Sequence, residues 1–556
     1  MSAQYFIGVD VGTASARAGL FDKNGNMVDF AVEPIPFFLE PGDRAESASA
    51  DIWHAVCKVV KTTVATAGID PAQIGGIGFD ATCSLVVLGQ DGVPLCVSDS
   101  GDASRDIIVW LDHRALAQAE RINAGGHGVL DYVGGRISPE MQTPKLLWLA
   151  ENRPEIFAAA WQFFDLPDFL TWKASGSLAR SSCTVTCKWT YLAHEQRWDA
   201  GYFRAIGLGA LADEGFARIG TDVVAPGTPL AQGLTAAAAR DLGLLPGTAI
   251  GSALIDAHAG GVGTVGASGG PGHSTSRMAY VFGTSACTMA SSPDPRPVPG
   301  IWGPYFDAMV PGLWLSEGGQ SAAGAALDHL VALHPAADRT RAKAEATNRS
   351  LTAYLADAAE HSNPLLSALA ELALGLHVVP EFLGNRAPHA NPMAKAIISG
   401  LGMDRSEQSL VNLYVAGLLG LGYGLRQILE ASGRSGIATD SIFISGGAGK
   451  SRLVRQLLAD TTGLPVAVTA SPEPVLLGSA MLGATAAGAY STLTEAMLAM
   501  SRVEDVVQPT AHYAEFHATR YEAFQQLQAV AETIRHAEHR TLGRQRGLPE
   551  RRVSEH

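Results

Sequence analysis

Two short segments combine glycine with hydroxyl side chains in a pattern that can hold phosphate. Their candidate residues are Asp10, Gly12, Thr13, Ser15 and Arg17 in the first segment and Gly283, Thr284 and Ser285 in the second. A tight glycine turn between two strands exposes consecutive backbone N–H groups, and these form a concavity for anions. The hydroxyls add neutral donors, Arg17 adds positive charge, and Asp10 at a strand end can hold Mg²⁺ through water. Two such turns facing each other across a cleft would clamp the phosphates of one nucleotide.

A third segment places glycines between an expected strand and an expected helix. The apolar run 442–445 leads into it, and a helix is expected over 451–460. Its candidate ligands are Gly446, Gly447, Ala448 and Ser451. The start of a helix suits a nucleotide because its first N–H groups have no partner within the helix. Each glycine turn alone is an ordinary turn, but the three segments together favour nucleotide binding.

A framework of strands must position these segments, and the remaining residues predict one. Apolar runs predict strands at 5–9, 17–21, 27–30, 74–79 and 85–88. Asn24-Gly25 is a hairpin signal, so the first three strands are expected to form an antiparallel meander. Valines and isoleucines at helical spacing predict a helix over 51–66. The fold class is therefore α/β.

The first glycine turn and its flanking strands resemble a second segment about half a chain later. YFIGVDVGTASARAGLF resembles MAYVFGTSACTMA, because both consist of an apolar strand, a Gly-Thr-Ser-type turn and a second apolar strand. Two copies suggest two similar domains that face each other, although copies this short also arise by chance. The glycine-rich, loop-like stretch 258–276 separates the halves and predicts domains over 1–262 and 263–535. The polar, arginine-rich residues 536–556 are expected to form a flexible tail.

Composition and charge narrow the classes of partner. Of 556 residues, 47% are hydrophobic and 17% charged, which is typical of a folded protein. The net charge of −14 makes nucleic acid and anionic membrane surfaces poor expectations. The six cysteines form no C-x-x-C pair, so we expect reduced thiols and no zinc site. The N-terminus lacks a signal-peptide pattern and the uncharged stretch 474–494 is typical of a buried helix, so a cytoplasmic protein is expected.

Seven motifs, in this order from Tyr5 to Tyr490, resemble the FGGY family of carbohydrate kinases. They are GVDVGTASARAGLFD, VWLDHRA, TPKLLWLAEN, LIDAHAGGVG, FGTSACTM, ISGGAGKSRLVRQLLAD and EPVLLGSAMLGA. The resemblance implies the two-domain actin-like ATPase (ribonuclease H-like) fold, with duplicated domains around a central cleft. The N-terminal domain would bind the sugar and carry the first phosphate turn, and the C-terminal domain would bind the nucleotide. ATP and Mg²⁺ are the implied cofactors. A homodimer is a further expectation from the resemblance, and the sequence leaves the oligomeric state open.

Two further motifs, GIGFDATCSLVVL and FFDLPDFLTWKASG, are most similar to the ribulokinase branch of this family. Glycerol kinases would show Arg-Glu, and xylulokinases Met-His, where this chain has Cys83-Ser84. The resemblance therefore implies ATP-dependent phosphorylation of the terminal (C5) hydroxyl of a ketopentose, D-ribulose first. L-ribulose, D-xylulose and a pentitol such as ribitol stay open as alternative substrates. Outside the class, the alternatives are an actin-like ATPase switch without a sugar substrate and a family member that has lost catalysis.

The family's general base is an Asp after an apolar strand, and the matching residue here is Asp256. A carboxylate within hydrogen-bond reach can take the proton of a sugar hydroxyl as it attacks phosphorus, typically worth about 10²–10⁴ in rate. Apart from the resemblance, Asp256 is more typical of a cap on a helix that starts at Ala257, because an Asp directly before a helix is common. The next polar residue, His258, is expected to be a core or hinge histidine, because Asp-x-His alone does not make a metal site.

The resemblance also implies a sugar pocket on both halves of the chain. Its expected members are Cys83, Ser84, Lys188, Asp256, Glu317 and Gln320. A polyhydroxyl ligand needs several paired donors and acceptors, and Lys188 can polarise a ketone oxygen. The alternatives are a surface lysine for Lys188 and a helix-start charge for Glu317. Asp112 and Arg114 either line the cleft or pair with each other.

Overall fold

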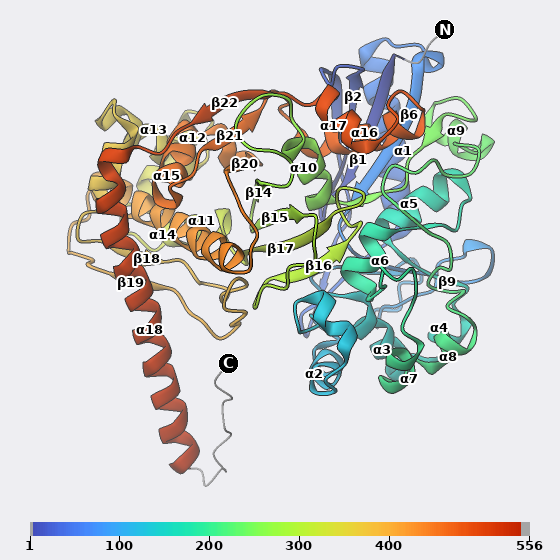
Figure 1. Ribbon diagram of the computed structural model, residues 1–556, viewed down its shortest axis with the longest axis horizontal. Helices are drawn as coiled ribbons and strands as arrows, with labels where there is room; N and C mark the ends of the chain where they lie inside the picture. Colours follow the sequence, from blue (N-terminus) through green and yellow to red (C-terminus); the bar gives the residue numbers. More distant parts are fainter. Residues whose placement is uncertain (1–3, 546–556) are drawn as a thin grey trace.

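The computed structural model describes residues 4–545, which form two α/β bodies side by side (Figure 1). The N-terminal body holds the strands coloured blue, and the C-terminal body holds most of the yellow and orange helices. Each body is built around one large mixed sheet. Within the described residues, no helix is both long and apolar enough to span a bilayer.

The N-terminal sheet has the order β12-β6-β1-β2-β3, with β13 also paired to β6. Its strands are β1 (Tyr5–Val11), β2 (Ser15–Asp22), β3 (Met27–Pro34), β6 (Ile74–Ala81), β12 (Ala249–Ile250) and β13 (Leu254–Ile255). The predicted antiparallel meander of β1, β2 and β3 is confirmed. Strands β1 and β6 run parallel and are almost wholly buried, because helices cover both faces of the sheet.

The C-terminal sheet repeats this plan with seven strands in the order β16-β17-β15-β14-β20-β21-β22. Its strands are β14 (Arg277–Phe282), β15 (Ala286–Ser292), β16 (Trp302–Phe306), β17 (Trp314–Gln320), β20 (Ser441–Ser445), β21 (Val466–Thr469) and β22 (Val503–Val507). The β14–β15 hairpin is antiparallel and β20 lies parallel beside β14, as β6 lies beside β1. The internal resemblance seen in the sequence is therefore a structural repeat.

Helices and short strands surround the two sheets. The helices of the N-terminal body are α1 (Ser49–Ala67), α2 (Leu116–Ala124), α3 (Gln142–Asn152), α4 (Pro154–Ala159), α5 (Leu166–Ser175), α6 (Ser182–Trp189), α7 (Ala200–Ala205), α8 (Gly209–Asp213) and α9 (Ala236–Leu242). Those of the C-terminal body include α11 (Gly324–Ala332), α12 (Ala337–Ala346), α13 (Leu351–Ser362), α14 (Glu407–Arg434) and α15 (Arg452–Thr462). The smaller sheets pair β4 (Phe38–Glu40), β5 (Arg44–Ser47), β8 (Ile107–Ile108), β7 (Leu85–Leu88) and β9 (Gln162–Asp165), then β10 (Arg180–Ser181) with β11 (Val223–Val224), and β18 (His377–Val379) with β19 (Ile397–Ser399).

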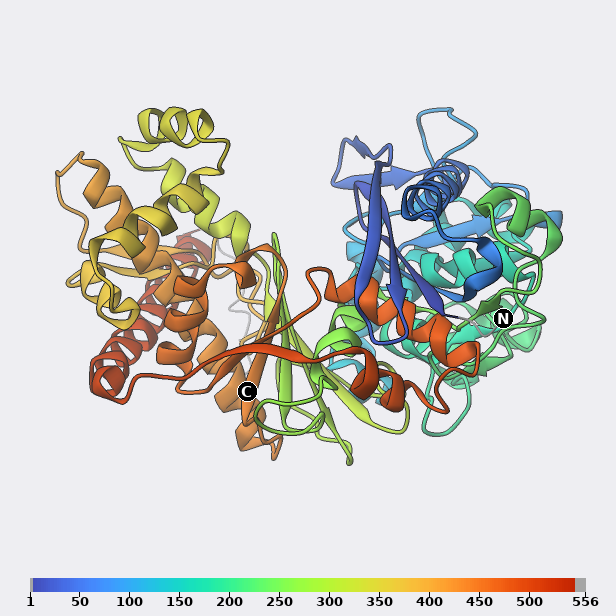
Figure 2. The same cartoon turned by 90° about the horizontal axis from the view of Figure 1, so that it is seen from above.

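Two glycine-rich helices, α10 (Asp256–Val265) and α16 (Pro474–Ala486), pack against each other where the bodies meet. Figure 2 shows α16 beside β1, although it comes from the other end of the chain; α17 (Leu493–Met500) follows it. The loop-like interpretation of 258–276 is wrong as far as Val265. The glycines serve close packing: a Cβ on Gly263 would lie 2.0 Å from the Pro474 carbonyl oxygen, and one on Gly478 2.0 Å from that of Ala259.

The long helix α18 (Ala514–Gln545) projects from the C-terminal body (Figure 1). The expectation of a flexible tail is wrong for residues 536–545, which continue the helix. That stretch has no proline and a single glycine, and Ala, Glu, Gln and Arg are good helix formers. Residues 546–556 of the expected tail lie outside the described part of the chain.

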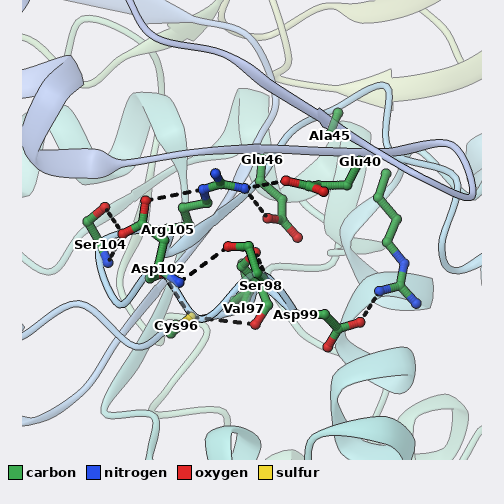
Figure 3. Close-up of polar contacts among 12 residues, drawn as sticks. Glu40, Ala45, Glu46, Cys96, Val97, Ser98, Asp99, Asp102, Ser104 and Arg105 are labelled. Atoms are coloured by element: carbon green, nitrogen blue, oxygen red, sulfur yellow. Dashed lines mark hydrogen bonds and ion pairs between the residues drawn. The ribbon is translucent and has the colours of Figure 1, made fainter.

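A polar cluster ties the loop before β8 to the β4–β5 hairpin (Figure 3). Arg105 lies between Glu40, with Nη1 2.5 Å from Oε1, and Glu46, with Nη1 3.6 Å from Oε2. Glu46 is buried and also accepts from Arg114 Nη2 at 2.8 Å. Arg114 Nε donates to Asp112 Oδ1 at 2.8 Å, so these two residues form a buried structural pair.

Candidate active site

Three aspartates lie at the carboxyl ends of neighbouring parallel strands. Asp10 in β1 is the register partner of Asp80 in β6, and Asp80 is paired with Leu254 in β13, two residues before Asp256. Because parallel strands end at one edge of a sheet, the three carboxyl groups converge there. That edge is where open α/β sheets bind their ligands.

Asp256 is half-buried and begins α10, where its Oδ1 accepts a hydrogen bond from the Ala257 N–H at 2.7 Å. Burial raises the pKa of Asp256 to about 6, and the charge of Asp10 adds to the increase. The helix-start and general-base interpretations are thus compatible, since one carboxyl oxygen fixes the group and the other remains for a ligand. A carboxylate with a pKa near neutrality is well suited to accept a proton.

Arg17 joins the first glycine turn to the helix that crosses from the C-terminal part of the chain. Its Nε donates to Asp10 Oδ2 at 2.7 Å, and its Nη1 donates to Glu473 Oε2 at 2.8 Å. Glu473 stands directly before α16 and was not anticipated from the sequence. Because two carboxylates engage the guanidinium, the contact of Arg17 with ATP stays a prediction.

The sheet edge that carries Asp10, Asp80 and Asp256 suits a cation that is bound by one or two carboxylates and otherwise by water and phosphate. Within residues 4–545, no group of three or more His, Cys, Asp or Glu side chains could hold a metal ion. Mg²⁺ usually keeps several waters and binds one or two carboxylates together with phosphate oxygens. Asp10 offers such an oxygen. Beside it, Asp80 is fully buried, and its Oδ1 has no hydrogen-bond partner in the described part of the chain. Burial, with the charge of Asp10, raises the pKa of Asp80 well above its ordinary value.

Each of the two Gly-Thr turns is closed by an internal hydrogen bond, which spans three positions in the first turn and two in the second. Gly12 N–H donates to the Ser15 carbonyl at 3.0 Å, and Gly283 N–H donates to the Ser285 carbonyl at 2.9 Å. The carbonyl of Thr284, the residue after Gly283, accepts a hydrogen bond at 2.9 Å from the N–H of Ala323, which directly precedes α11. These bonds close the turns and leave their inner N–H groups for an anion.

The third glycine loop lies directly beside the second turn. Gly446 follows β20 with φ of 87°, and a Cβ there would lie 2.3 Å from the Phe282 carbonyl oxygen. Only glycine permits this approach. Gly447 and Ala448 begin a short 3-10 turn, and Ser451 then caps α15, its Oγ accepting from the backbone at 3.3 Å.

Helix α10 brings Asp256 to these turns. A Cβ on Gly260, one helical turn after Asp256, would lie 3.3 Å from Val281 Cγ2 and 3.9 Å from Ser445 Oγ. Val281 and Ser445 stand at the ends of β14 and β20, which lead into the second and third glycine segments. One helical turn after Asp256, α10 therefore contacts the ends of the two strands that lead into the second and third glycine segments.

Lys188, His258 and Glu317 form a buried cluster beside Asp256. Lys188 Nζ lies 3.6 Å and His258 Nε2 lies 3.4 Å from the same oxygen, Glu317 Oε2. The surface interpretation of Lys188 is wrong, because the residue is only 5% exposed. The helix-start interpretation of Glu317 is also wrong, because the residue lies inside β17.

The charges of this cluster support one another. Burial would raise the pKa of Glu317, but Lys188, His258 and Arg386 hold it below its ordinary value. Burial would lower the pKa of His258, but Cys183, with Sγ 3.0 Å from Nδ1, raises it to about 9. His258 is thus a core histidine, as expected from the sequence.

The structure brings Cys83 and Ser84 to the same region. Burial raises the pKa of Cys83 to about 12, and the nearby Lys188 opposes this increase. Ser84 is buried, and its Oγ accepts from Trp110 N–H at 3.1 Å. Trp110 Nε1 donates to the Thr13 hydroxyl at 3.0 Å, so this half-buried indole links the pocket to the first glycine turn. Sequence reasoning passed over Trp110 within its VWLDHRA motif.

Gln320 does not join the cluster of Lys188 and Glu317. Its Nε2 donates to the Leu421 carbonyl of α14 at 2.9 Å, and its Oε1 accepts from Tyr280 at 2.8 Å. Three positions separate Gln320 from Glu317 on one strand, and this odd spacing turns the two side chains to opposite faces.

Two residues that sequence reasoning did not single out complete the cluster. Arg386, in the loop after β18, donates from Nη2 to Glu317 Oε1 at 2.8 Å. Its guanidinium carbon lies 4.3 Å from the centre of the Trp302 ring, and Lys188 Nζ lies 4.8 Å from the same centre. Trp302 is the cross-strand partner of Glu317. Arg386 belongs to no periodic element, so no pattern in the sequence could have assigned it.

Comparisons with known families match both halves of the chain. The N-terminal domain of the FGGY family of carbohydrate kinases matches residues 5–263, and its C-terminal domain matches residues 278–487. Among solved structures, a xylulose kinase from Rhodospirillum rubrum aligns with a TM-score of 0.77 at 23% identity, covering 96% of this chain and all of that one. At this identity the alignment shows the fold, and it confirms the two-domain kinase architecture expected from the sequence.

Curated relatives agree with this assignment. A human FGGY carbohydrate kinase domain-containing protein is 46% identical over 94% of this chain and 96% of its own length. A D-ribulokinase of Saccharomyces cerevisiae is 38% identical over 87% of this chain and 72% of its own. A ribulokinase of Mycolicibacterium smegmatis is 31% identical over 94% of this chain and 92% of its own. The chain therefore belongs to the FGGY family of carbohydrate kinases, enzymes that use ATP to phosphorylate small sugars.

Proposed function

We propose that the protein transfers the γ-phosphoryl group of ATP to the terminal (C5) hydroxyl of D-ribulose, giving D-ribulose 5-phosphate. The observation that carries the proposal is the position of Asp256 at the start of α10, one helical turn before that helix contacts β14 and β20, and two residues before His258 of the buried Lys188–Glu317 cluster. The names of the relatives support a ketopentose, since one is a D-ribulokinase and another a ribulokinase. L-ribulose, D-xylulose and ribitol are the alternative substrates.

In this proposal each group of residues has one task. Asp256 accepts the proton of the C5 hydroxyl as that oxygen attacks phosphorus. Lys188 donates to the ketone oxygen, and Glu317 accepts from sugar hydroxyls beside the wall that Cys83 and Ser84 form. The N–H groups of the glycine turns hold the phosphates, so that alignment and charge neutralisation supply the remaining acceleration.

Asp10 is the residue that would hold Mg²⁺, through water. When bound, the ion neutralises charge on the phosphate oxygens. Water competes with the sugar for the phosphoryl group, so we expect the two bodies to close over both substrates. The cytoplasmic location and the homodimer stay predictions from the sequence.

The test is an ADP-release assay with D-ribulose, L-ribulose, D-xylulose, ribitol and glycerol. We expect the highest kcat/KM for D-ribulose and a low rate of ATP hydrolysis without sugar. A preference for another pentulose or pentitol would replace the substrate within the same class. An ATPase rate that no sugar changes would contradict the proposal and favour the nucleotide-switch alternative.

A further inference from the structure

Lys188 is a buried cation whose ammonium donates no hydrogen bond to any residue in 4–545. Its side chain is 7% exposed, and the nearest carboxylate oxygen within the described residues, Glu317 Oε2, lies 3.6 Å away. That separation exceeds the usual length of an N–H···O hydrogen bond, about 2.7–3.2 Å. The ammonium is therefore held by charge without its protons being taken, which leaves them for a ligand oxygen.

Glu317 does not approach Lys188 more closely because Arg386 binds its other carboxylate oxygen. Arg386 Nη2 donates to Glu317 Oε1 at 2.8 Å, a normal hydrogen bond between charged groups. The second oxygen is shared between His258 at 3.4 Å and Lys188 at 3.6 Å. Without Arg386, the strongest partner of Glu317 would be lost and its carboxylate would be free to turn onto Lys188.

Arg386 is itself held in place by Glu317 and by two further contacts. Its guanidinium lies over Trp302, its Nη1 is 3.7 Å from Cys287 Sγ, and Trp302 pairs across the strands with Glu317. Its Nε is buried and has no hydrogen-bond partner among the described residues, so the group is positioned by Glu317, the Trp302 indole and Cys287. Lys188 contacts the same indole, which attracts both cations and spaces them apart.

We infer that Arg386, resting on Trp302, is a positioning residue that holds Glu317 away from Lys188 and so leaves the Lys188 ammonium for the carbonyl oxygen of a ketose. Arg386 thereby sets the preference of the site for a ketose over the corresponding polyol, which has no carbonyl for Lys188 to bind. The inference rests on the proposed function, because it presumes that the substrate is a ketopentose.

The test compares binding of D-ribulose and ribitol to the full chain by calorimetry, without ATP. In R386Q we expect the Kd of D-ribulose to rise at least about tenfold more than that of ribitol, the scale of one hydrogen bond to a charged group. Both sugars lose the Glu317 acceptor, but only the ketose also loses the Lys188 donor. R386K, which can still pair with Glu317, should recover part of the preference. The KM for ATP should stay within about twofold of wild type in both variants.

R426Q is the matched control. Arg426 also lies over an aromatic ring, 4.2 Å from the centre of Tyr521, and its Nε donates to Glu430 at 2.9 Å, but it is on α14 away from the cluster. It should keep the wild-type preference. A wild-type preference in R386Q would overturn the inference. If R386Q does not fold, a full wild-type preference in R386K would overturn it, because only partial recovery is expected. A wild type that prefers neither sugar and shows no sugar-dependent ADP release would instead overturn the proposed function, and the inference with it.

Discussion

The Asp256→Asn substitution should lower the turnover rate and, at pH 8, raise the free energy of unfolding, so it distinguishes a catalytic role of Asp256 from a structural one. The substitution keeps the size of the side chain and removes the proton acceptor, so turnover with D-ribulose should fall by about 10²–10⁴, the usual contribution of a general base. ATP binding should persist, since Asp256 lies outside the glycine turns. In the wild type, kcat/KM should rise with pH as Asp256 ionises, with a midpoint near its pKa of about 6.

The sign of the stability change follows from the same pKa. A folded-state pKa of about 6, above the ordinary 3.8, means that the fold favours the protonated acid. The protonated carboxyl of Asp256 contributes to the free energy of unfolding below pH 3.8, and this contribution is lost as the pH rises through about 6. The loss at pH 8 is at most about 3 kcal/mol, from 1.36 kcal/mol per pKa unit. Asn carries no charge, so D256N should gain up to that amount over wild type at pH 8 and almost nothing at pH 4.

Unfolding by denaturant at pH 4 and pH 8, beside steady-state assays from pH 5 to 8, measures both effects. Asp51→Asn is the matched control, because Asp51 also stands in the first turn of a helix, α1, but is exposed. It should change neither activity nor the pH dependence of stability. Near-normal turnover in D256N, or a kcat/KM that is flat across pH 6, would refute the assignment of the base.

Three further substitutions probe the framework. Gly446→Ala should raise the KM for ATP more than that for sugar in steady-state assays, because a Cβ would lie 2.3 Å from a carbonyl oxygen of β14; equal effects on both would count against a nucleotide role. Gly478→Ala should destabilise the fold by about 1–3 kcal/mol in denaturant unfolding, because its Cβ would lie 2.0 Å from the α10 backbone; an unchanged midpoint would contradict the close crossing of α10 and α16. Asp80→Asn should match or exceed wild-type stability at pH 8, because it removes a buried acid whose pKa is raised by burial and by Asp10; a marked loss would show that the ionised form is required.

Local signals were sufficient to predict the two strand–turn–strand hairpins. Alternation of apolar runs with Gly-Thr turns is a property of neighbouring residues, so β1–β2 and β14–β15 could be found without knowledge of the fold. The same reasoning failed for α10. Glycine lowers intrinsic helix stability by about 1 kcal/mol per residue, and only packing against α16 recovers the helix.

The side-chain partners of the site could not be predicted from the sequence. Arg17 and Glu473 are 456 positions apart, and Arg386 and Glu317 are 69 apart. Such pairs depend on the tertiary fold, which brings distant segments together, and no spacing in the chain encodes them. Lys188 and Glu317 were assigned by family resemblance alone, and Gln320, assigned in the same way, turns to the other face of its strand.

The most direct measurement is the position at which phosphate is attached. With wild-type protein, ATP and D-ribulose carrying ¹³C at carbon 5, NMR of the product should show ³¹P coupled to that carbon, and D256N should yield almost none. Phosphate on another carbon, or release of free phosphate at the same rate with and without the pentulose, would contradict the assignment of Asp256 to the terminal alcohol of a ketose.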